Sequence, residues 1–120
     1  MSAAESWADE SFCYITTVGR RTGRPHTIEI WFGVADGRLY VLSGGARSDW
    51  FLNLKADPEV RIRAGPDEDR RARATVVDDP EEDAMARRLL AAKYQGWSEG
   101  KPLSSWARTA HPVRFELSPA

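Results

Sequence analysis

Short segments of alternating apolar and polar residues, separated by glycine and proline turn signals, recur along most of this chain of 120 residues. A period of two predicts strands with one face on a core. The Asp36-Gly37 pair is typical of a tight hairpin. The pattern restricts the chain to folds built on an antiparallel sheet, with strands expected at residues 11–19, 26–34, 39–43, 59–64, 72–77 and 113–117.

Helix signals interrupt the strands at two places. Residues 48–56 begin with Ser-Asp, which can cap a short helix, and residues 79–82 read Asp-Pro-Glu-Glu, a cap followed by proline at the first helical position. Residues 95–109 are expected to form a long, partly ordered loop. An open parallel sheet would need more crossover helices. We therefore expect a mainly β, α+β fold, a small antiparallel barrel of six strands and two helices.

The composition limits the possible partners. Seventeen basic and eighteen acidic residues give a net charge of -1, so no global field attracts nucleic acid or a membrane surface. One cysteine and two histidines predict neither a disulfide nor a metal site. No apolar run approaches a membrane span, so we expect a cytoplasmic protein without stable membrane insertion. Residues 1–10 are expected to be a flexible segment before a single domain over residues 11–120.

The turn Arg-Arg-Thr-Gly-Arg-Pro at residues 20–25 is the sharpest cluster of chemistry-bearing side chains. Backbone N–H groups, a hydroxyl and guanidinium groups suit phosphate oxygens. A solvated hairpin tip, basic for solubility, explains the pattern equally well. The spacing is not that of a nucleotide-hydrolase phosphate loop, and a strand follows it instead of a helix. The turn is therefore a candidate anion-binding site, formed by Arg20, Arg21 and Arg24 beside Thr22 and Gly23.

A second candidate site suits a flat ligand. Gly44-Gly45, between a strand and a helix, permits close approach of a ring or an anion, although a plain turn explains it equally well. The five tryptophans exceed what a core of this size requires. Aromatic walls suit flat, conjugated ligands, and the tryptophans expected outside the core are Trp31, Trp97 and Trp106.

Three segments carry a resemblance to a known family. They are residues 16–25, the Trp31-Phe32 pair and residues 49–58. Together they resemble the deazaflavin (F420)-dependent nitroreductase family of the FMN-binding split-barrel superfamily, found chiefly in actinobacteria. The resemblance runs from about Tyr14 to the last strand. It implies a six-stranded antiparallel split β-barrel that binds coenzyme F420 and passes a hydride to a quinone, an enone or a nitro compound.

The resemblance also implies which residues bind the coenzyme. The basic turn and His26 would hold its phosphate-bearing tail, through Arg20, Arg21 and Thr22. Asn53 matches a helix asparagine that faces the cofactor. The deazaflavin ring would lie against the second strand and the loop after the third, at Ile30, Trp31, Phe32, Ser43, Gly44, Gly45 and Ala46. The region comparable to the substrate pocket of the family contains Tyr94, Trp97 and Trp106.

Two alternatives remain open at this point. The same fold with flavin mononucleotide, as in pyridoxamine-oxidase-like split barrels, would use the same basic turn. A non-catalytic deazaflavin-binding protein is the other. No side chain is nominated as catalytic because the cofactor carries the chemistry, and a proton could come from solvent or from a hydroxyl such as that of Ser43 or Tyr94. Both a monomer and a homodimer fit the sequence.

Overall fold

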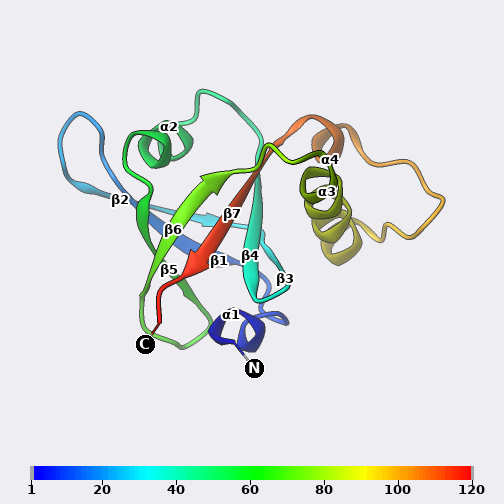
Figure 1. Cartoon of the computed structure of the whole chain (residues 1–120), viewed down its shortest axis with the longest axis horizontal. Helices are drawn as coiled ribbons and strands as arrows, with labels where there is room; N and C mark the ends of the chain where they lie inside the picture. Colours follow the sequence, from blue (N-terminus) through cyan, green and yellow to red (C-terminus); the bar gives the residue numbers. More distant parts are fainter. Residues whose placement is uncertain (1, 120) are drawn as a thin grey trace.

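The computed structural model describes residues 2–119 as one antiparallel sheet that curls around a core (Figure 1). The strand order is β2-β1-β5-β6-β7-β4-β3, and the paired strands are antiparallel throughout. The expected mainly β split-barrel class is confirmed. Its strands are β1 Cys13–Val18, β2 Pro25–Ile30, β3 Gly33–Ala35, β4 Arg38–Ser43, β5 Glu59–Ala64, β6 Arg70–Val76 and β7 His111–Leu117.

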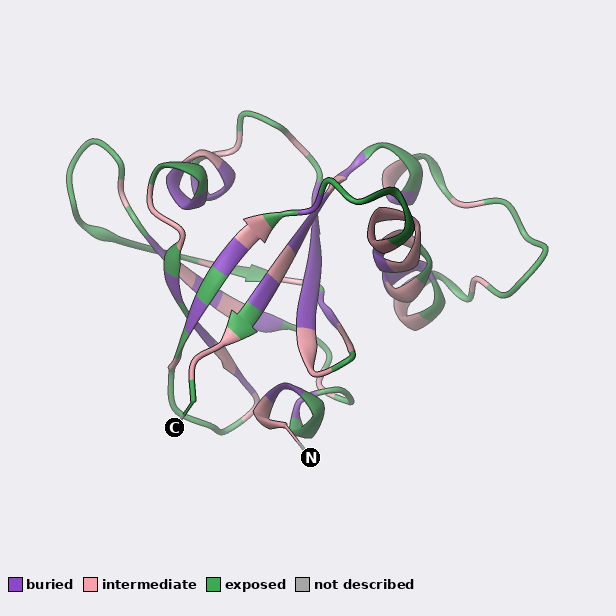
Figure 2. Ribbon diagram, in the orientation of Figure 1, coloured by how far each residue is buried: buried purple, intermediate pink, exposed green. Residues whose placement is uncertain are grey.

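The core occupies the concave face of the sheet, where the alternation in sequence becomes alternation in burial. Ile15, Ile62 and Phe115 are fully buried, whereas their strand neighbours Arg61 and Glu116 are exposed. Figure 2 shows the same change along β5 and β6. Each large apolar side chain removed from water stabilises the fold by roughly 1.5–3 kcal/mol, so this face drives the folding of the sheet.

Within residues 2–119 the sheet has seven strands instead of the expected six, because residues 26–34 do not form one continuous strand. Phe32 turns into the core with no exposed surface. Its backbone N–H donates to the Tyr94 hydroxyl at 3.0 Å, outside the sheet ladder. A side chain at Gly33 would collide with Leu89, whose Cγ would lie 2.7 Å from the new Cβ. Packing of the helix that contains Leu89 therefore splits the segment into β2 and β3.

The helices also differ from the expectation, which included two of them. The described part of the chain has four, α1 Ala3–Ser6, α2 Asp49–Ala56, α3 Pro80–Gln95 and α4 Ser105–Thr109. The segment expected to be a loop thus contains α4, because Ser104 accepts the Ala107 N–H at 3.1 Å and caps it. Within residues 1–10, where flexibility was expected, α1 leads into Trp7, which is 3% exposed and donates to Asp67 Oδ2 at 2.6 Å.

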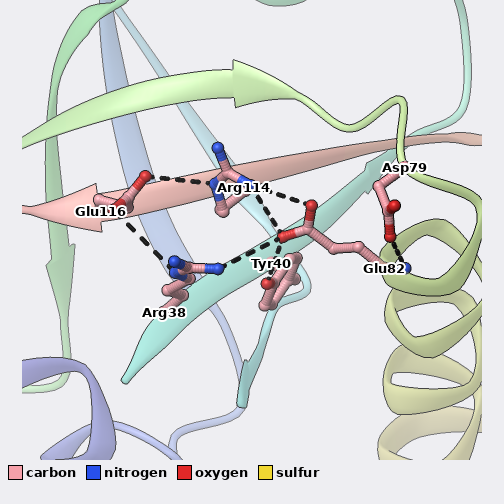
Figure 3. A network of polar contacts seen from close by, with 6 residues as sticks. All are labelled: Arg38, Tyr40, Asp79, Glu82, Arg114 and Glu116. Atoms are coloured by element: carbon pink, nitrogen blue, oxygen red, sulfur yellow. Dashed lines mark hydrogen bonds and ion pairs between the residues drawn. The ribbon is translucent and has the colours of Figure 1, made fainter. Parts of the chain in front are cut away.

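Helix α3 is fastened to the sheet by Glu82 in its first turn (Figure 3). The Glu82 carboxylate accepts the Tyr40 hydroxyl at 2.7 Å and an Arg114 guanidinium N–H at 2.9 Å. Arg38 lies 3.8 Å from the same carboxylate. Burial acts to raise the pKa of Glu82, but the hydrogen bonds from Tyr40 and Arg114 and the nearby positive charges outweigh it and lower this pKa. The ionised carboxylate is therefore part of the fold.

Two further features of residues 2–119 bear on the class of protein. None of the helices described there combines the length and apolar character that a membrane crossing requires. The same residues contain no cluster of three or more histidine, cysteine or acidic side chains placed to hold a metal ion. Cys13 is buried in the core, and burial raises the pKa of its thiol to about 12.

Candidate functional site

The hairpin between β1 and β2 carries the basic turn to one end of the molecule, next to α2 (Figure 1). The turn closes through hydrogen bonds from the Gly19 N–H to the Arg24 carbonyl and from the Gly23 N–H to the Gly19 carbonyl, both at 2.8 Å. Gly23 has φ +73°, a conformation that glycine adopts without a Cβ penalty. The Thr22 hydroxyl accepts the Arg24 N–H at 3.2 Å. The side chains at the tip therefore project from a hydrogen-bonded frame.

Arg20 fastens this hairpin to α2. Its backbone N–H and its guanidinium group both donate to Asn53 Oδ1, at 3.1 and 2.9 Å, and its Nη2 lies 3.3 Å from Asp49 Oδ1. Asn53 is 3% exposed and donates from Nδ2 to the Thr17 hydroxyl at 3.2 Å. These contacts use the polar atoms of Arg20 and Asn53 for structure. Arg20 and Asn53, both predicted to bind the coenzyme, thus hold in place the turn that also carries Arg21 and Arg24.

Three cationic or titratable side chains remain at the turn. Arg21, Arg24 and His26 are exposed, and their side chains have no hydrogen-bond or ion-pair partner within residues 2–119. They surround a cavity of about 340 Å³, which we call the hairpin cavity. Its lining is Gly19, Arg20, Arg21, Thr22, Arg24, Pro25, His26, Asp49 and Asn53.

A second cavity of about 560 Å³, the aromatic cavity, lies at the other end of β2. Its walls are apolar and aromatic, with a carboxylate from Glu29 and an amide from Gln95. The Glu29 carboxylate accepts the Tyr14 hydroxyl at 3.0 Å. This combination of flat walls and few polar groups is typical of small-molecule sites. The lining is Phe12, Glu29, Ile30, Trp31, Leu42, Gly44, Gln95 and Trp106.

Trp31 is the aromatic centre of this region. It is 42% exposed and stacks on Tyr94 with ring centroids 4.4 Å apart and an interplanar angle of 2°. Trp106 meets it edge to face at 5.5 Å. Contacts of this kind hold an exposed indole in one orientation. Trp31 therefore offers a fixed flat surface to a ligand in the aromatic cavity.

The Tyr94 hydroxyl holds the break between β2 and β3. It accepts the Phe32 N–H at 3.0 Å, and the carbonyl oxygens of Ser11 and Phe32 lie 2.8 and 2.9 Å from it as acceptors for its proton. Burial raises the pKa of Tyr94, an effect opposed by the Phe32 N–H. The hydroxyl is occupied by backbone groups, which argues against its use as a proton donor.

Replacing Tyr94 by phenylalanine is expected to destabilise the protein by about 1–2 kcal/mol, because the Phe32 backbone loses its partner at a partly buried position. Thermal unfolding of the variant would show a melting temperature lower by roughly 5 °C. Tyr14→Phe is the matched control, because the Tyr14 hydroxyl bonds only the exposed Glu29 within the described chain. Equal stability of wild type and Tyr94→Phe would contradict the role of this hydroxyl.

The loop after β4 offers open backbone. A side chain at Gly45 would meet no atom within 4 Å, and one at Gly44 would touch only the Trp106 ring at 3.9 Å. Ser43 is fully buried, and its hydroxyl donates to the Gly45 carbonyl at 2.8 Å. Ser48 donates to the same carbonyl at 3.0 Å. The two hydroxyls shape the loop, and the glycines leave room beside it for a planar group.

The predicted site residues are divided among several places. Ile30, Trp31, Gly44 and Trp106 meet at the aromatic cavity, and the basic turn, His26 and Asn53 meet at the hairpin cavity. Phe32 and Ser43 have no exposed surface, so their side chains reach neither cavity. Gly23, Gly45 and Ala46 line neither cavity. Tyr94 lies behind Trp31, in a neighbouring cavity. Trp97 lines a separate cavity, where it donates to the Lys101 carbonyl at 2.7 Å.

Sequence reasoning missed several residues of this region. Phe12, Glu29, Leu42 and Gln95 complete the aromatic cavity from strand ends and the end of α3. Lys93 lines a neighbouring cavity of about 570 Å³ behind Trp31, with its Nζ 3.8 Å from the Phe32 ring centroid. Burial lowers the pKa of Lys93, against the influence of nearby acidic groups. No periodicity or motif in the sequence distinguishes these residues from ordinary strand and helix positions.

The fold is shared with several solved structures. A protein described as an F420 reductase aligns over 99% of this chain and 96% of its own, with 18% identity and a TM-score of 0.67. An FAD-binding protein from Mesorhizobium loti aligns over 99% and 91%, with 16% identity and a TM-score of 0.67. The heme storage protein HutZ from Vibrio cholerae aligns over 97% and 87%, with 17% identity and a TM-score of 0.74. These likenesses place the chain in the class of split β-barrel proteins.

Residues 3–110 match the model of the family described as F420H(2)-dependent quinone reductase. The chain belongs to this family, which confirms the resemblance and makes it an oxidoreductase of the F420-dependent kind. The residues present fit the cofactor. A donor set of free guanidinium groups at the hairpin cavity suits a phosphate, and open glycine backbone beside a fixed indole suits a planar ring.

Proposed function

We propose that this protein passes a hydride from reduced coenzyme F420 to a small organic acceptor, either a quinone, an enone or a nitro compound. The observation that carries the proposal is the placement of the two cavities on one strand. His26 lines the hairpin cavity and Trp31 follows the other end of β2 at the aromatic cavity. Five residue steps of a strand span about 17 Å, a length suited to a coenzyme with a ring at one end and a phosphate-bearing tail.

Each end of this strand has a separate task in the proposal. Arg21 and Thr22, joined by Arg24 and His26, hold the phosphate-bearing tail. Ile30, Trp31 and the Gly44-Gly45 backbone hold the ring, and Trp106 closes the wall. Arg20 and Asn53 act indirectly, because the hydrogen bond between them holds the turn against α2.

When bound, the coenzyme supplies the hydride, and the chain's own residues orient it and limit access of water. The hydroxyls of Ser43 and Tyr94 are both engaged in hydrogen bonds with backbone groups. Solvent is therefore the proposed source of the proton. The acceptor binds in the open part of the aromatic cavity, against Phe12 and Gln95.

The test is turnover of reduced coenzyme F420 with a panel of acceptors, namely a naphthoquinone, a cyclohexenone and a nitroimidazole. We expect the oxidised deazaflavin absorbance to return faster with the protein than without it for at least one class. A Phe12→Ala variant should raise KM for that acceptor more than it changes coenzyme affinity, because the acceptor binds against Phe12 in this proposal. Tight coenzyme binding without turnover on any acceptor would replace the reductase by a non-catalytic binding protein.

Flavin mononucleotide is the second candidate cofactor. The solved FAD-binding relative of the same fold shows that this barrel accommodates a flavin in another protein. The hairpin cavity offers its arginines equally to a flavin phosphate. A purified protein with a yellow flavin spectrum would favour this candidate over the deazaflavin.

A further inference from the structure

The outer face of β1, β2, β5 and β6, opposite the core, carries its charged side chains in rows across the strands. In one row the Tyr14 hydroxyl donates to Glu29, and Arg63 lies over the Tyr14 ring at 4.5 Å and 3.6 Å from Asp69. In another row, Arg73 donates to Glu59 at 2.8 Å. The arginine in each of these rows has an acidic partner from the chain itself.

The row between them has two cations and no such partner. Thr16 of β1 pairs with Arg61 of β5, and Arg61 pairs with Arg71 of β6, so the two arginines stand directly opposite each other. Both are exposed, and neither guanidinium group has a hydrogen bond or ion pair within residues 2–119. Like charges directly opposite on neighbouring strands destabilise a sheet. The middle row therefore favours an anion supplied from outside.

A cavity lies beside the Arg61–Arg71 pair. Arg61 and Arg71 line a cavity of about 310 Å³ together with Thr16, Val18 and Pro25. The Thr16 and Thr27 hydroxyls lie 2.7 Å apart, and one of them keeps a proton that it can donate elsewhere.

Two carboxylates also line the cavity, but both are engaged. Asp57 accepts the Glu59 N–H at 3.1 Å, and Glu59 holds Arg73. Neither carboxylate forms an ion pair with Arg61 or Arg71 within residues 2–119, so an incoming anion would meet two forked guanidinium groups that have no ion-pair partner.

We propose that the Arg61–Arg71 row binds the carboxylate or phosphate group of a small molecule, at a site separate from the hairpin and aromatic cavities. Two sources can supply this chemistry. One is a free oxyanion, and the other is the anionic tail of a bound coenzyme, because Pro25 lines both this cavity and the hairpin cavity. The arginine row itself does not depend on the proposed coenzyme.

The first experiment titrates the full-length protein with inorganic phosphate and with citrate at low ionic strength, following the arginine Nε–Hε resonances by NMR. We expect saturable shifts at Arg61 and Arg71. Arg61→Gln and Arg71→Gln should each weaken binding at least tenfold, by loss of one forked donor. Arg63→Gln, which alters a neighbouring row with an acidic partner, should change it less than twofold. Equal, non-saturable shifts at all three arginines would overturn the proposal.

A second experiment distinguishes the two sources of the anion, the free oxyanion and the coenzyme tail. Neither experiment depends on turnover. If the coenzyme tail is the ligand, Arg71→Gln weakens binding of coenzyme F420 but leaves binding of the tail-less deazaflavin unchanged. If a free oxyanion is the ligand, Arg71→Gln leaves both deazaflavin affinities unchanged and weakens only the binding of phosphate and citrate. Weaker binding of both deazaflavins by Arg71→Gln would contradict a separate anion site, because the arginine would then act on the ring.

Discussion

Coenzyme F420 is expected to bind about 100-fold more weakly when Arg21 and Arg24 are both replaced by glutamine, since each lost charge-assisted hydrogen bond is worth roughly 1.5 kcal/mol or more. The two side chains are exposed and make no contact that holds the hairpin together in the described chain. The fold should therefore survive the change. Isothermal titration of the wild type and the double variant measures the effect, and circular dichroism checks the fold.

The matched control is Arg88→Gln, an exposed arginine on α3 that lines none of the cavities described above. It should leave the coenzyme affinity unchanged within twofold. The wild-type affinity should also fall as salt increases, and the double variant should lose most of this dependence, because screening acts on the charges that were removed. Equal affinities of the wild type and the double variant would remove the turn from the site.

Replacement of Glu82 by alanine is expected to destabilise the fold by about 2–3 kcal/mol, because a half-buried network loses its acceptor. Tyr40 loses its partner, and the acidic partner left to Arg114 within residues 2–119 is Glu116, 3.3 Å away and exposed. Urea unfolding at neutral pH gives the free energy of unfolding of both proteins. Glu81→Ala, an exposed neighbour in the same helical turn, is the control and should change the free energy by less than about 0.5 kcal/mol.

The effect of Glu82 should depend on pH in a defined direction. Its pKa in the folded protein lies below the ordinary value of 4.5, so the unfolded chain binds the proton more readily. The stabilisation is complete above the unfolded pKa and is lost as the pH falls through the folded pKa. The difference between the wild type and Glu82→Ala should therefore shrink as the pH falls below about 5 and through the lowered pKa of the folded protein. A difference that grew on acidification would contradict the ionised state of this carboxylate.

Strands β1, β5 and β6 were predictable because each alternates between buried and more exposed residues along its own sequence. The alternation in residues 59–64, for example, places Val60 and Ile62 in the core as expected. The break at Trp31-Phe32 was not predictable, because the contacts there come from α3: Leu89 packs on Gly33, and the hydroxyl of Tyr94, 62 residues further along the chain, accepts the Phe32 N–H. Helix α4 had a local signal, the Ser104 cap, which was hidden in a loop-like segment, residues 98–105, that also contains two other serines, a glycine and a proline.

The candidate site was predictable to a similar degree. A basic turn and an exposed Trp31 follow from local residue types, and the structure places them at the two ends of β2. The different roles of the arginines in the turn depend on α2, since Arg20 differs from Arg21 through its contacts with Asn53 and Asp49. The distance of Trp97 from the aromatic cavity depends on the path of the chain after α3, which no local pattern specifies.

The most direct test of a deazaflavin site on β2 is a parallel titration of the protein with coenzyme F420 and with flavin mononucleotide, followed by tryptophan fluorescence. We expect micromolar binding of coenzyme F420, weaker binding of the flavin, and quenching that falls sharply in Trp31→Phe, because Trp31 forms the wall of the aromatic cavity. A preference for flavin mononucleotide, or quenching that is identical in the wild type and Trp31→Phe, would contradict the site as we describe it.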